Sequence, residues 1–173
     1  MEKWDIMNAE GEATGRQTLR GGGCLAAGEY HLVVHIWIIS SDGKLLIQRR
    51  SKKKRFMPGE WAATGGAAIA GETSLDAARR ELYEELGIHS KEEDLTLIKR
   101  FRRKNSFVDL WVVRKDIPTY RLRLQRSEVS AAKWVSREKL RDMLRTGNYH
   151  NYGEDYFNAV FSALEGNTDG TTK

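Results

Sequence analysis

Three glutamates are spaced so that their carboxylates share one face of a helix. Glu81, Glu84 and Glu85 stand at positions i, i+3 and i+4 of one segment. Like charges this close repel one another unless a cation lies among them, and carboxylate oxygens are hard ligands that suit Mg²⁺ or Mn²⁺. The spacing therefore predicts a divalent-metal site with Glu81, Glu84 and Glu85 as ligands.

The neighbours of these glutamates favour a site over a plain charged surface, which is what a bare E-x-x-E-E on a helix usually is. Arg80 can pair with Glu84 one turn further on, or with Glu72 at the end of the preceding loop, and so hold the carboxylates in place. The glycines Gly65 and Gly66 let the backbone approach closely, and the Gly65 carbonyl is a candidate fourth ligand.

The helix that carries the glutamates has the clearest pattern in the chain. Leu75, Ala78, Leu82 and Leu86 recur every three or four residues and form one apolar stripe. Gly87 follows as a natural C-terminal cap. The stripe is expected to anchor the helix in the core, with the carboxylates on the opposite face.

The rest of the chain indicates a mixed α/β domain. Segments rich in Val, Ile and Trp, bounded by turn residues, predict strands. No linker divides the chain, so we expect one domain over residues 1–165 and a small, polar, disordered tail over 166–173. The expected strands are residues 2–7, 31–40, 44–49, 61–64, 95–103, 107–114 and 131–135, and the later helices are 136–145 and 154–165.

Composition excludes several classes of protein. With 173 residues, 40% hydrophobic and 31% charged, the chain suits one folded domain rather than a disordered or membrane-embedded one. The single cysteine excludes an internal disulfide. The longest apolar stretch, residues 32–39, is too short to span a bilayer, and the N-terminal residues do not form a signal peptide. We therefore expect a cytoplasmic protein without membrane contact.

The net charge of +5 raises the possibility of nucleic-acid binding. The cations gather in two runs, residues 49–55 and 99–104, while the acids gather around the predicted helix. A nucleic-acid surface would interleave exposed aromatics with such cations, and Phe101 and Phe107 fit that pattern only weakly. A small phosphorylated substrate handled through metal ions explains the charge better than a nucleic acid.

Residues 66–88 read GAAIAGETSLDAARRELYEELGI and fit the pattern G-x5-E-x7-R-E-U-x-E-E-x-G-U, where U is aliphatic. This segment resembles the signature, or box, of the Nudix hydrolases. The resemblance implies an α/β fold, an α/β/α sandwich on a mixed, mostly antiparallel sheet. It also implies hydrolysis of the P–O–P bridge in a nucleoside diphosphate linked to another group X. All seven fixed positions are filled, by Gly66, Glu72, Arg80, Glu81, Glu84, Glu85 and Gly87.

The resemblance also assigns roles within the box. It implies Glu81 and Glu85 as first-choice ligands of Mg²⁺ or Mn²⁺, joined by Glu84, and catalytic roles for Glu81, Glu84 and Arg80. The general base would be one of these glutamates or a carboxylate on a later segment. Glu128 and Asp109 are the candidates for that later carboxylate, although each also suits a plain surface or turn position.

A second likeness lies outside the box and is to the isopentenyl-diphosphate isomerase branch of the superfamily, over roughly residues 3–145. It implies that Arg50, Lys54 and Arg55 contact the diphosphate, and it implies isomerisation of an allylic diphosphate as an alternative reaction. The motifs that carry it are Trp4-Asp5 to Gly15, Tyr30-His31-Leu32, Gln48-Arg49-Arg50-Ser51, Lys54-Arg55 and Pro58-Gly59-x-Trp61.

Departures from the isomerase pattern favour hydrolysis on an isomerase-like scaffold. The isomerases carry a catalytic cysteine just before the box and a metal-binding histidine soon after that cysteine, but Gly65 and Ala67 hold those places here. Cys24 lies too far upstream to replace the nucleophile. His31 and His35 share one face of a strand, which permits a metal role, but hydrogen-bonded positions near the core are the expectation for both.

A protein that binds without catalysis could carry the same box. A module that binds nucleotides or RNA is therefore a second alternative to hydrolysis, and it predicts binding that survives removal of metal. The main hypothesis expects a small diphosphate-containing molecule as the partner. An exchanged N-terminal strand is a plausible basis for a homodimer.

Overall fold

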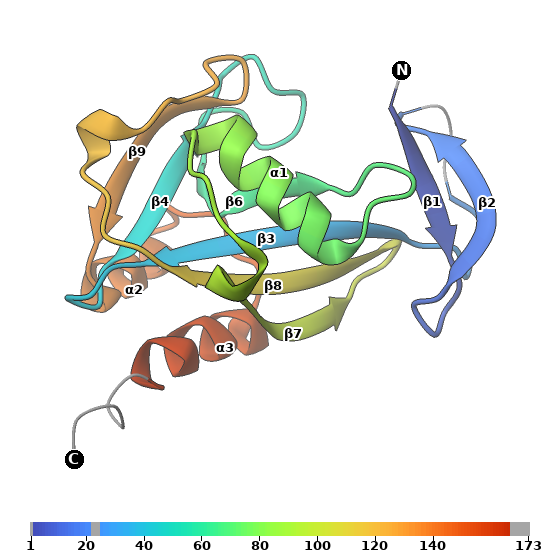
Figure 1. Cartoon of the computed structure of the whole chain (residues 1–173). Coiled ribbons are helices and arrows are strands. Elements are labelled where there is room, and N and C mark those ends of the chain that lie inside the picture. The colour runs from blue at the N-terminus through green and yellow to red at the C-terminus, as the bar shows by residue number, and fades with distance from the viewer. Residues whose placement is uncertain (1, 22–24, 167–173) are drawn as a thin grey trace.

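The computed structural model describes residues 2–21 and 25–166 (Figure 1). Cys24 and residues 167–173 of the expected tail over 166–173 lie outside the described residues. No helix among the described residues is long and apolar enough to cross a membrane. The elements are β1 (Lys3–Met7), β2 (Ala13–Leu19), β3 (His31–Ile39), β4 (Leu45–Arg50), β5 (Trp61–Ala62), β6 (Thr64–Ala67), α1 (Ser74–Leu86), β7 (Leu95–Arg102), β8 (Ser106–Arg114), β9 (Val129–Val135), α2 (Arg137–Arg145) and α3 (Glu154–Glu165), with short 3₁₀ turns at Glu92–Asp94 and Thr119–Arg121.

A mixed sheet forms the centre of the domain. Its strands follow the order β5-β4-β3-β8-β7, with β6 also paired to β3 and β9 to β4. Only the β3–β8 pair is parallel among the described pairings of this sheet, and it runs in unbroken register from His31 opposite Ser106 to Ile39 opposite Arg114. The mixed and mostly antiparallel sheet is as predicted.

Helices cover both faces of this sheet, as the alternation of side chains along β3 requires. Ile36 and Ile38 pack with Leu82 of α1 on one face. Trp37 packs with Tyr156 of α3 on the other face, in a cluster that also includes residues of α2. The result is the α/β/α sandwich expected from the box (Figure 1).

The N-terminal hairpin differs from the sequence prediction. Strand β2 was not expected, because residues 13–19 are polar and almost fully exposed and so lack the apolar alternation that marks a strand. It pairs with β1 in a separate two-stranded sheet of the same chain. The expected strand at 61–64 is also two short strands, β5 and β6, with Ala63 between them.

Local sequence explains the boundaries of α1. The hydroxyl of Thr73 accepts from the backbone N–H of Asp76, whose carboxylate accepts from the N–H of Thr73 in return, so the helix begins with a capping box. Gly87 ends it with φ of 70°, a left-handed conformation in which its N–H reaches the carbonyls of Leu82 and Tyr83. These caps fix where α1 begins and ends, and its buried side chains fix which face it turns to the core.

Candidate active site

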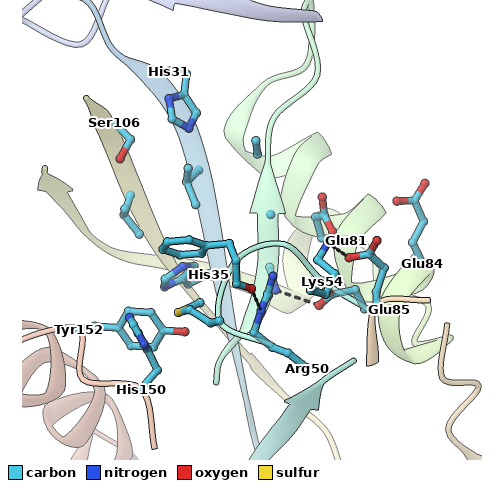
Figure 2. A pocket seen from close by; sticks show the side chains of 18 of the residues that line it. His31, His35, Arg50, Lys54, Glu81, Glu84, Glu85, Ser106, His150 and Tyr152 are labelled. Atoms are coloured by element: carbon cyan, nitrogen blue, oxygen red, sulfur yellow. Dashed lines mark hydrogen bonds and ion pairs between the residues drawn. The ribbon is translucent and has the colours of Figure 1, made fainter. Parts of the chain in front are cut away.

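A pocket of about 610 Å³ opens beside α1 and the glycine strand β6. Its walls come from α1, β6, the loop after β4, the N-terminal hairpin and the segment before α3. Glu81, Glu84 and Glu85 lie along one side of it, and His35, Tyr152 and His150 lie on the other (Figure 2). The three predicted ligands therefore border one cavity.

Glu85 is the most buried carboxylate of the site, with 3% of the residue exposed. Its Oε2 accepts hydrogen bonds from Nε2 of Gln48 at 2.7 Å and from the backbone N–H of Gly65 at 3.1 Å. Burial, together with the negative charge of Glu81, raises the pKa of this carboxyl group to about 8. An ionised Glu85 therefore needs a nearby positive charge that these two neutral donors do not supply.

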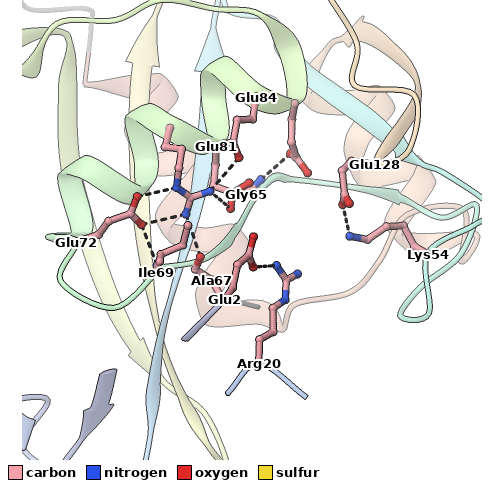
Figure 3. Close-up of polar contacts among 12 residues, drawn as sticks. Glu2, Arg20, Lys54, Gly65, Ala67, Ile69, Glu72, Glu81, Glu84 and Glu128 are labelled. Atoms are coloured by element: carbon pink, nitrogen blue, oxygen red, sulfur yellow. Dashed lines mark hydrogen bonds and ion pairs between the residues drawn. The ribbon is translucent and has the colours of Figure 1, made fainter. Parts of the chain in front are cut away.

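Arg80 holds several acidic side chains together (Figure 3). Its guanidinium donates to both oxygens of Glu72 at 2.6 and 3.0 Å, to Glu81 at 2.8 Å and to Glu84 at 3.0 Å. It also donates to the carbonyl of Ala67 at 3.1 Å. The sequence offered Glu72 and Glu84 as alternative partners, and the structure has both at once.

Two adjacent glycines allow the backbone of β6 to lie against its neighbours. Gly65 has φ of 150°, and a Cβ atom there would fall 2.0 Å from the carbonyl oxygen of Val34 on β3. At Gly66 a Cβ atom would fall 2.3 Å from Oε1 of Glu81. Gly65 thus allows a close approach to the backbone of β3, and Gly66 allows one to the carboxylate of Glu81.

The donor set suits a divalent cation, although the side chains are not gathered around one point. In residues 2–21 and 25–166, no three His, Cys, Asp or Glu side chains are grouped so that they could hold a metal. Arg80 donates to the carboxylates of Glu81 and Glu84, whereas Gln48 and Gly65 donate to that of Glu85. The buried carboxyl of Glu85 and the nearby charge of Glu81 are what a hard cation would stabilise.

The predicted phosphate contacts separate into two groups. Arg50 and Lys54 line the pocket, whereas Arg55 does not. Lys54 forms an ion pair with Glu128, which also lines the pocket. The backbone carbonyl of Phe56 accepts from Nε of Arg50 at 3.1 Å, which fixes that side chain in the loop.

Asp109 does not reach the pocket and is neither a surface nor a turn acid. It is fully buried on β8, and both of its oxygens accept from Arg100, at 2.6 and 2.8 Å. Arg100 lies directly opposite it on β7, so cross-strand register pairs the two charges. This arrangement removes Asp109 from the set of later carboxylates.

Comparison with known proteins decides the family. The NUDIX domain model matches residues 29–153 of the chain. The chain belongs to the Nudix hydrolases. An uncharacterized Nudix hydrolase of Listeria monocytogenes is 37% identical over 169 residues, which cover 97% of this chain and 98% of the relative. Nudix hydrolase 3 of Arabidopsis thaliana is 36% identical over 83% of this chain, a match that spans 20% of the plant protein.

A solved structure shows the same fold. The crystal structure of DR0079 from Deinococcus radiodurans has a TM-score of 0.74 and 27% sequence identity, over 87% of this chain and 93% of that one. The chain is thus a Nudix pyrophosphohydrolase, and the names of these relatives state no substrate.

The pocket of this Nudix hydrolase includes residues that the sequence did not indicate. Glu2 and Arg20 pair with each other at the hairpin side of the pocket (Figure 3), and Ser106, His150 and Tyr152 contribute from segments far from the box. No local pattern marks these positions, because only the folded sheet brings them to the box.

The two strand histidines of this Nudix domain are hydrogen-bonded, as predicted, and both also line the pocket. His31 stacks on Trp4 with ring centroids 4.2 Å apart, and its Nδ1 lies 3.0 Å from the carbonyl of Asn105. Nδ1 of His35 lies 2.9 Å from the hydroxyl of Tyr156. Burial, together with the positive charge of Arg103, lowers the pKa of His35 to about 3.

Proposed function

We propose that this Nudix hydrolase uses Mg²⁺, or Mn²⁺, to cleave the diphosphate bridge of a nucleoside diphosphate linked to another group X. The observation that carries the proposal is the pair of carboxylates, Glu81 and Glu85, on one side of a pocket that also contains the cations of Arg50 and Lys54. A pocket of about 610 Å³ has the size of sites that hold nucleotide-sized ligands.

The box residues would hold the metal and orient its ligands. Glu81, Glu85 and the Gly65 carbonyl are the proposed ligands, with Glu84 joining them. Bound Mg²⁺ would neutralise charge on the bridging phosphates and make water a better nucleophile. Arg80 holds the carboxylates of Glu81 and Glu84, and it would orient these two side chains as ligands of the metal.

Glu84 is the proposed proton acceptor. Its side chain is 45% exposed and lines the pocket, and Arg80 is its sole ion-pair partner among the described residues, so its carboxylate keeps free lone pairs. Glu128 is the remaining alternative, but its carboxylate pairs with Lys54. We propose that Glu128 positions Lys54 for the phosphates and takes no proton itself.

A substrate screen tests the proposed function. Purified protein with Mg²⁺ is assayed against a panel of diphosphate-containing metabolites. Released phosphate is read directly for nucleoside diphosphates, and after phosphatase coupling for sugar nucleotides and dinucleotides, whose cleavage gives phosphate monoesters. The Glu85→Gln variant should lose the release, while Glu93→Gln, which changes an exposed glutamate of the 92–94 turn, should keep it. Equal turnover by the two variants would contradict the proposed site.

The isomerase alternative is disfavoured by the position of Gly65. The isomerase cysteine would stand at this residue, but any side chain there would meet the carbonyl oxygen of Val34 at 2.0 Å. An isomerase-like scaffold with hydrolase chemistry therefore remains our proposal for the branch. Incubation with isopentenyl diphosphate and analysis for its allylic isomer distinguishes the two reactions.

The proposed partner is the small diphosphate substrate itself. Phe101 and Phe107 are 9% and 5% exposed, so they do not form an aromatic surface among the cations of residues 99–104, which argues against nucleic-acid binding. A cytoplasmic location stays a prediction, as does a homodimer. Within this chain β1 pairs with β2 rather than extending away for exchange.

A further inference from the structure

The hydroxyl of Tyr156 links two side chains of β3. It lies 2.9 Å from Nε1 of Trp37 and 2.9 Å from Nδ1 of His35, and Tyr156 is fully buried. A tryptophan Nε1–H can only donate, so the hydroxyl accepts from Trp37. Its own proton then needs an acceptor, since a buried hydroxyl left without one is costly.

His35 Nδ1 is the acceptor within reach of that proton among the described residues. It must therefore carry a lone pair, which places the single ring proton of a neutral His35 on Nε2. The tautomer of His35 thus follows from the directions of two hydrogen bonds, from Trp37 to Tyr156 and from Tyr156 to His35.

The Nε2 atom of His35 has no hydrogen-bond partner among residues 2–21 and 25–166. The ring lines the pocket, partly exposed, with the ring of Tyr152 at a centroid distance of 4.7 Å. His35, Tyr152 and His150 lie together, across the pocket from the glutamates (Figure 2). An N–H donor of fixed direction thus faces the cavity away from the metal side.

The pocket also offers flat apolar surfaces to a ligand. Phe56 lines it and is 68% exposed, so its ring is available for contact with a ligand. Met57 beside it also lines the pocket, and its φ of 49° is a left-handed conformation that holds the loop in a tight bend there. Planar heterocycles stack on such side chains.

We propose that His35 is a specificity-determining donor that reads a carbonyl oxygen on the planar base of the substrate. The inference rests on the proposed function, because the diphosphate must lie at the glutamates for the base to reach His35. A carbonyl oxygen accepts from Nε2–H, whereas an amino group at the same place leaves two donors facing each other. Bases with a carbonyl on the edge that faces His35 are therefore preferred over bases with an amino group.

The tautomer is tested in the full-length protein without any ligand. The chain has four histidines, so ¹⁵N-labelled imidazole spectra with His35→Gln for assignment resolve the ring of His35. Nδ1 should show the shift of an unprotonated nitrogen and Nε2 that of a protonated one. In Tyr156→Phe this preference should weaken, while His89→Gln should leave it unchanged. A proton found on Nδ1 of the wild-type protein would overturn the inference.

The preference is tested with two purine probes that differ in the group at C6 and, with it, in the proton on N1. Inosine diphosphate carries a carbonyl at C6 and adenosine diphosphate an amino group. Dissociation constants are measured by calorimetry with Ca²⁺, and hydrolysis of both probes is measured with Mg²⁺. Inosine diphosphate should bind about tenfold more tightly, as expected for one net hydrogen bond.

Variants of His35 separate the two proposals. His35→Phe should abolish the preference, and His35→Gln, which keeps an N–H donor, should restore most of it. Equal binding of the probes to the wild-type protein, or a preference that survives His35→Phe, would overturn the role of His35 even if both are hydrolysed. A preference that depends on His35 without any hydrolysis would overturn the proposed reaction and leave this inference standing.

Discussion

The side-chain amide of Gln48 donates to Oε2 of Glu85 at 2.7 Å, and both residues are buried. The backbone N–H of Gly65 donates to the same oxygen. One oxygen of Glu85 thus receives both protein hydrogen bonds, which leaves the other oxygen without a donor from the described residues. The oxygen that accepts these hydrogen bonds holds the side chain in place, and the other oxygen is available to bind a ligand.

This arrangement makes Glu85→Gln a clean test of charge. The amide oxygen of glutamine can keep both hydrogen bonds, so we expect an unchanged fold by circular dichroism. Mg²⁺-dependent phosphate release should fall by about 100-fold or more, because a neutral amide is a poor ligand for a hard cation. Turnover within about threefold of wild type would contradict the assignment of Glu85.

The raised pKa of Glu85 predicts a pH dependence of the metal-free protein. The folded state keeps a proton on this carboxyl group up to about pH 8, whereas the unfolded state loses it near 4.5. The folded state therefore binds more protons in this window, and stability in EDTA should fall as pH rises from about 5 to 8. Urea unfolding at several pH values measures this slope, which should flatten in Glu85→Gln.

Metal binding should release the proton that Glu85 carries in the metal-free protein. Below about pH 8 a cation must displace it from Glu85, so Mg²⁺ affinity should weaken by at most tenfold for each unit that pH falls. Calorimetry in buffers of different ionisation enthalpy counts the protons released. Proton release that is identical in wild type and Glu85→Gln would assign it to another group.

Arg80→Lys should separate charge from geometry. Lysine keeps the positive charge but cannot donate at once to Glu72, Glu81 and Glu84 as the guanidinium does. We expect Mg²⁺ affinity to fall about 10- to 100-fold, as for other residues that orient metal ligands, and the free energy of unfolding to fall by about 1–3 kcal/mol. Arg79→Lys, on the adjacent helix position, is the matched control.

The two glycines should respond differently to alanine. Gly65→Ala places a methyl group against backbone at a left-handed φ, so a loss of about 3 kcal/mol in unfolding free energy is expected. In Gly66→Ala the nearest contacts of the methyl group are with the carboxylate of Glu81, the end of a flexible side chain. Stability should therefore change by less than about 1 kcal/mol, while turnover falls about 10- to 100-fold. Thermal melts and phosphate release distinguish the two outcomes, and equal stability losses would contradict this reasoning.

Glu128→Gln tests whether this residue takes a proton. If it only positions Lys54, kcat should stay within about threefold, and Lys54→Met should raise KM about tenfold through loss of a phosphate contact. A fall of about 100-fold in kcat for Glu128→Gln would make Glu128 the base instead of Glu84.

The parts of the site that could be predicted are those encoded by local spacing. The periodic apolar residues of α1 and the cap at Gly87 predict the helix and the face that it buries. The shared face of Glu81, Glu84 and Glu85 could therefore be predicted too. Strand β2 lacked such a period, since its residues pack against little besides β1.

Other parts depend on which segments the sheet brings together. Lys54 and Arg55 are equivalent in a basic run, and only the bend of the loop directs the first of them into the pocket. The residues around Asp109 in the sequence do not indicate its ion-pair partner, because Arg100 becomes its neighbour only through the β7–β8 register. The hydrogen bond of His35 to Tyr156 spans 121 positions and has no counterpart in any local pattern.

The pocket walls differ in how they are distributed along the chain. The metal side comes from one short stretch, residues 64–86, while the rest of the lining comes from separate segments, which include the N-terminal hairpin, β3, the loop at 51–60 and the segment at 150–152. Substitutions in those distant segments leave the capped helix and its carboxylates as they are. After gene duplication, two descendants of such a protein can diverge in what they hydrolyse while each inherits the same way of hydrolysing it.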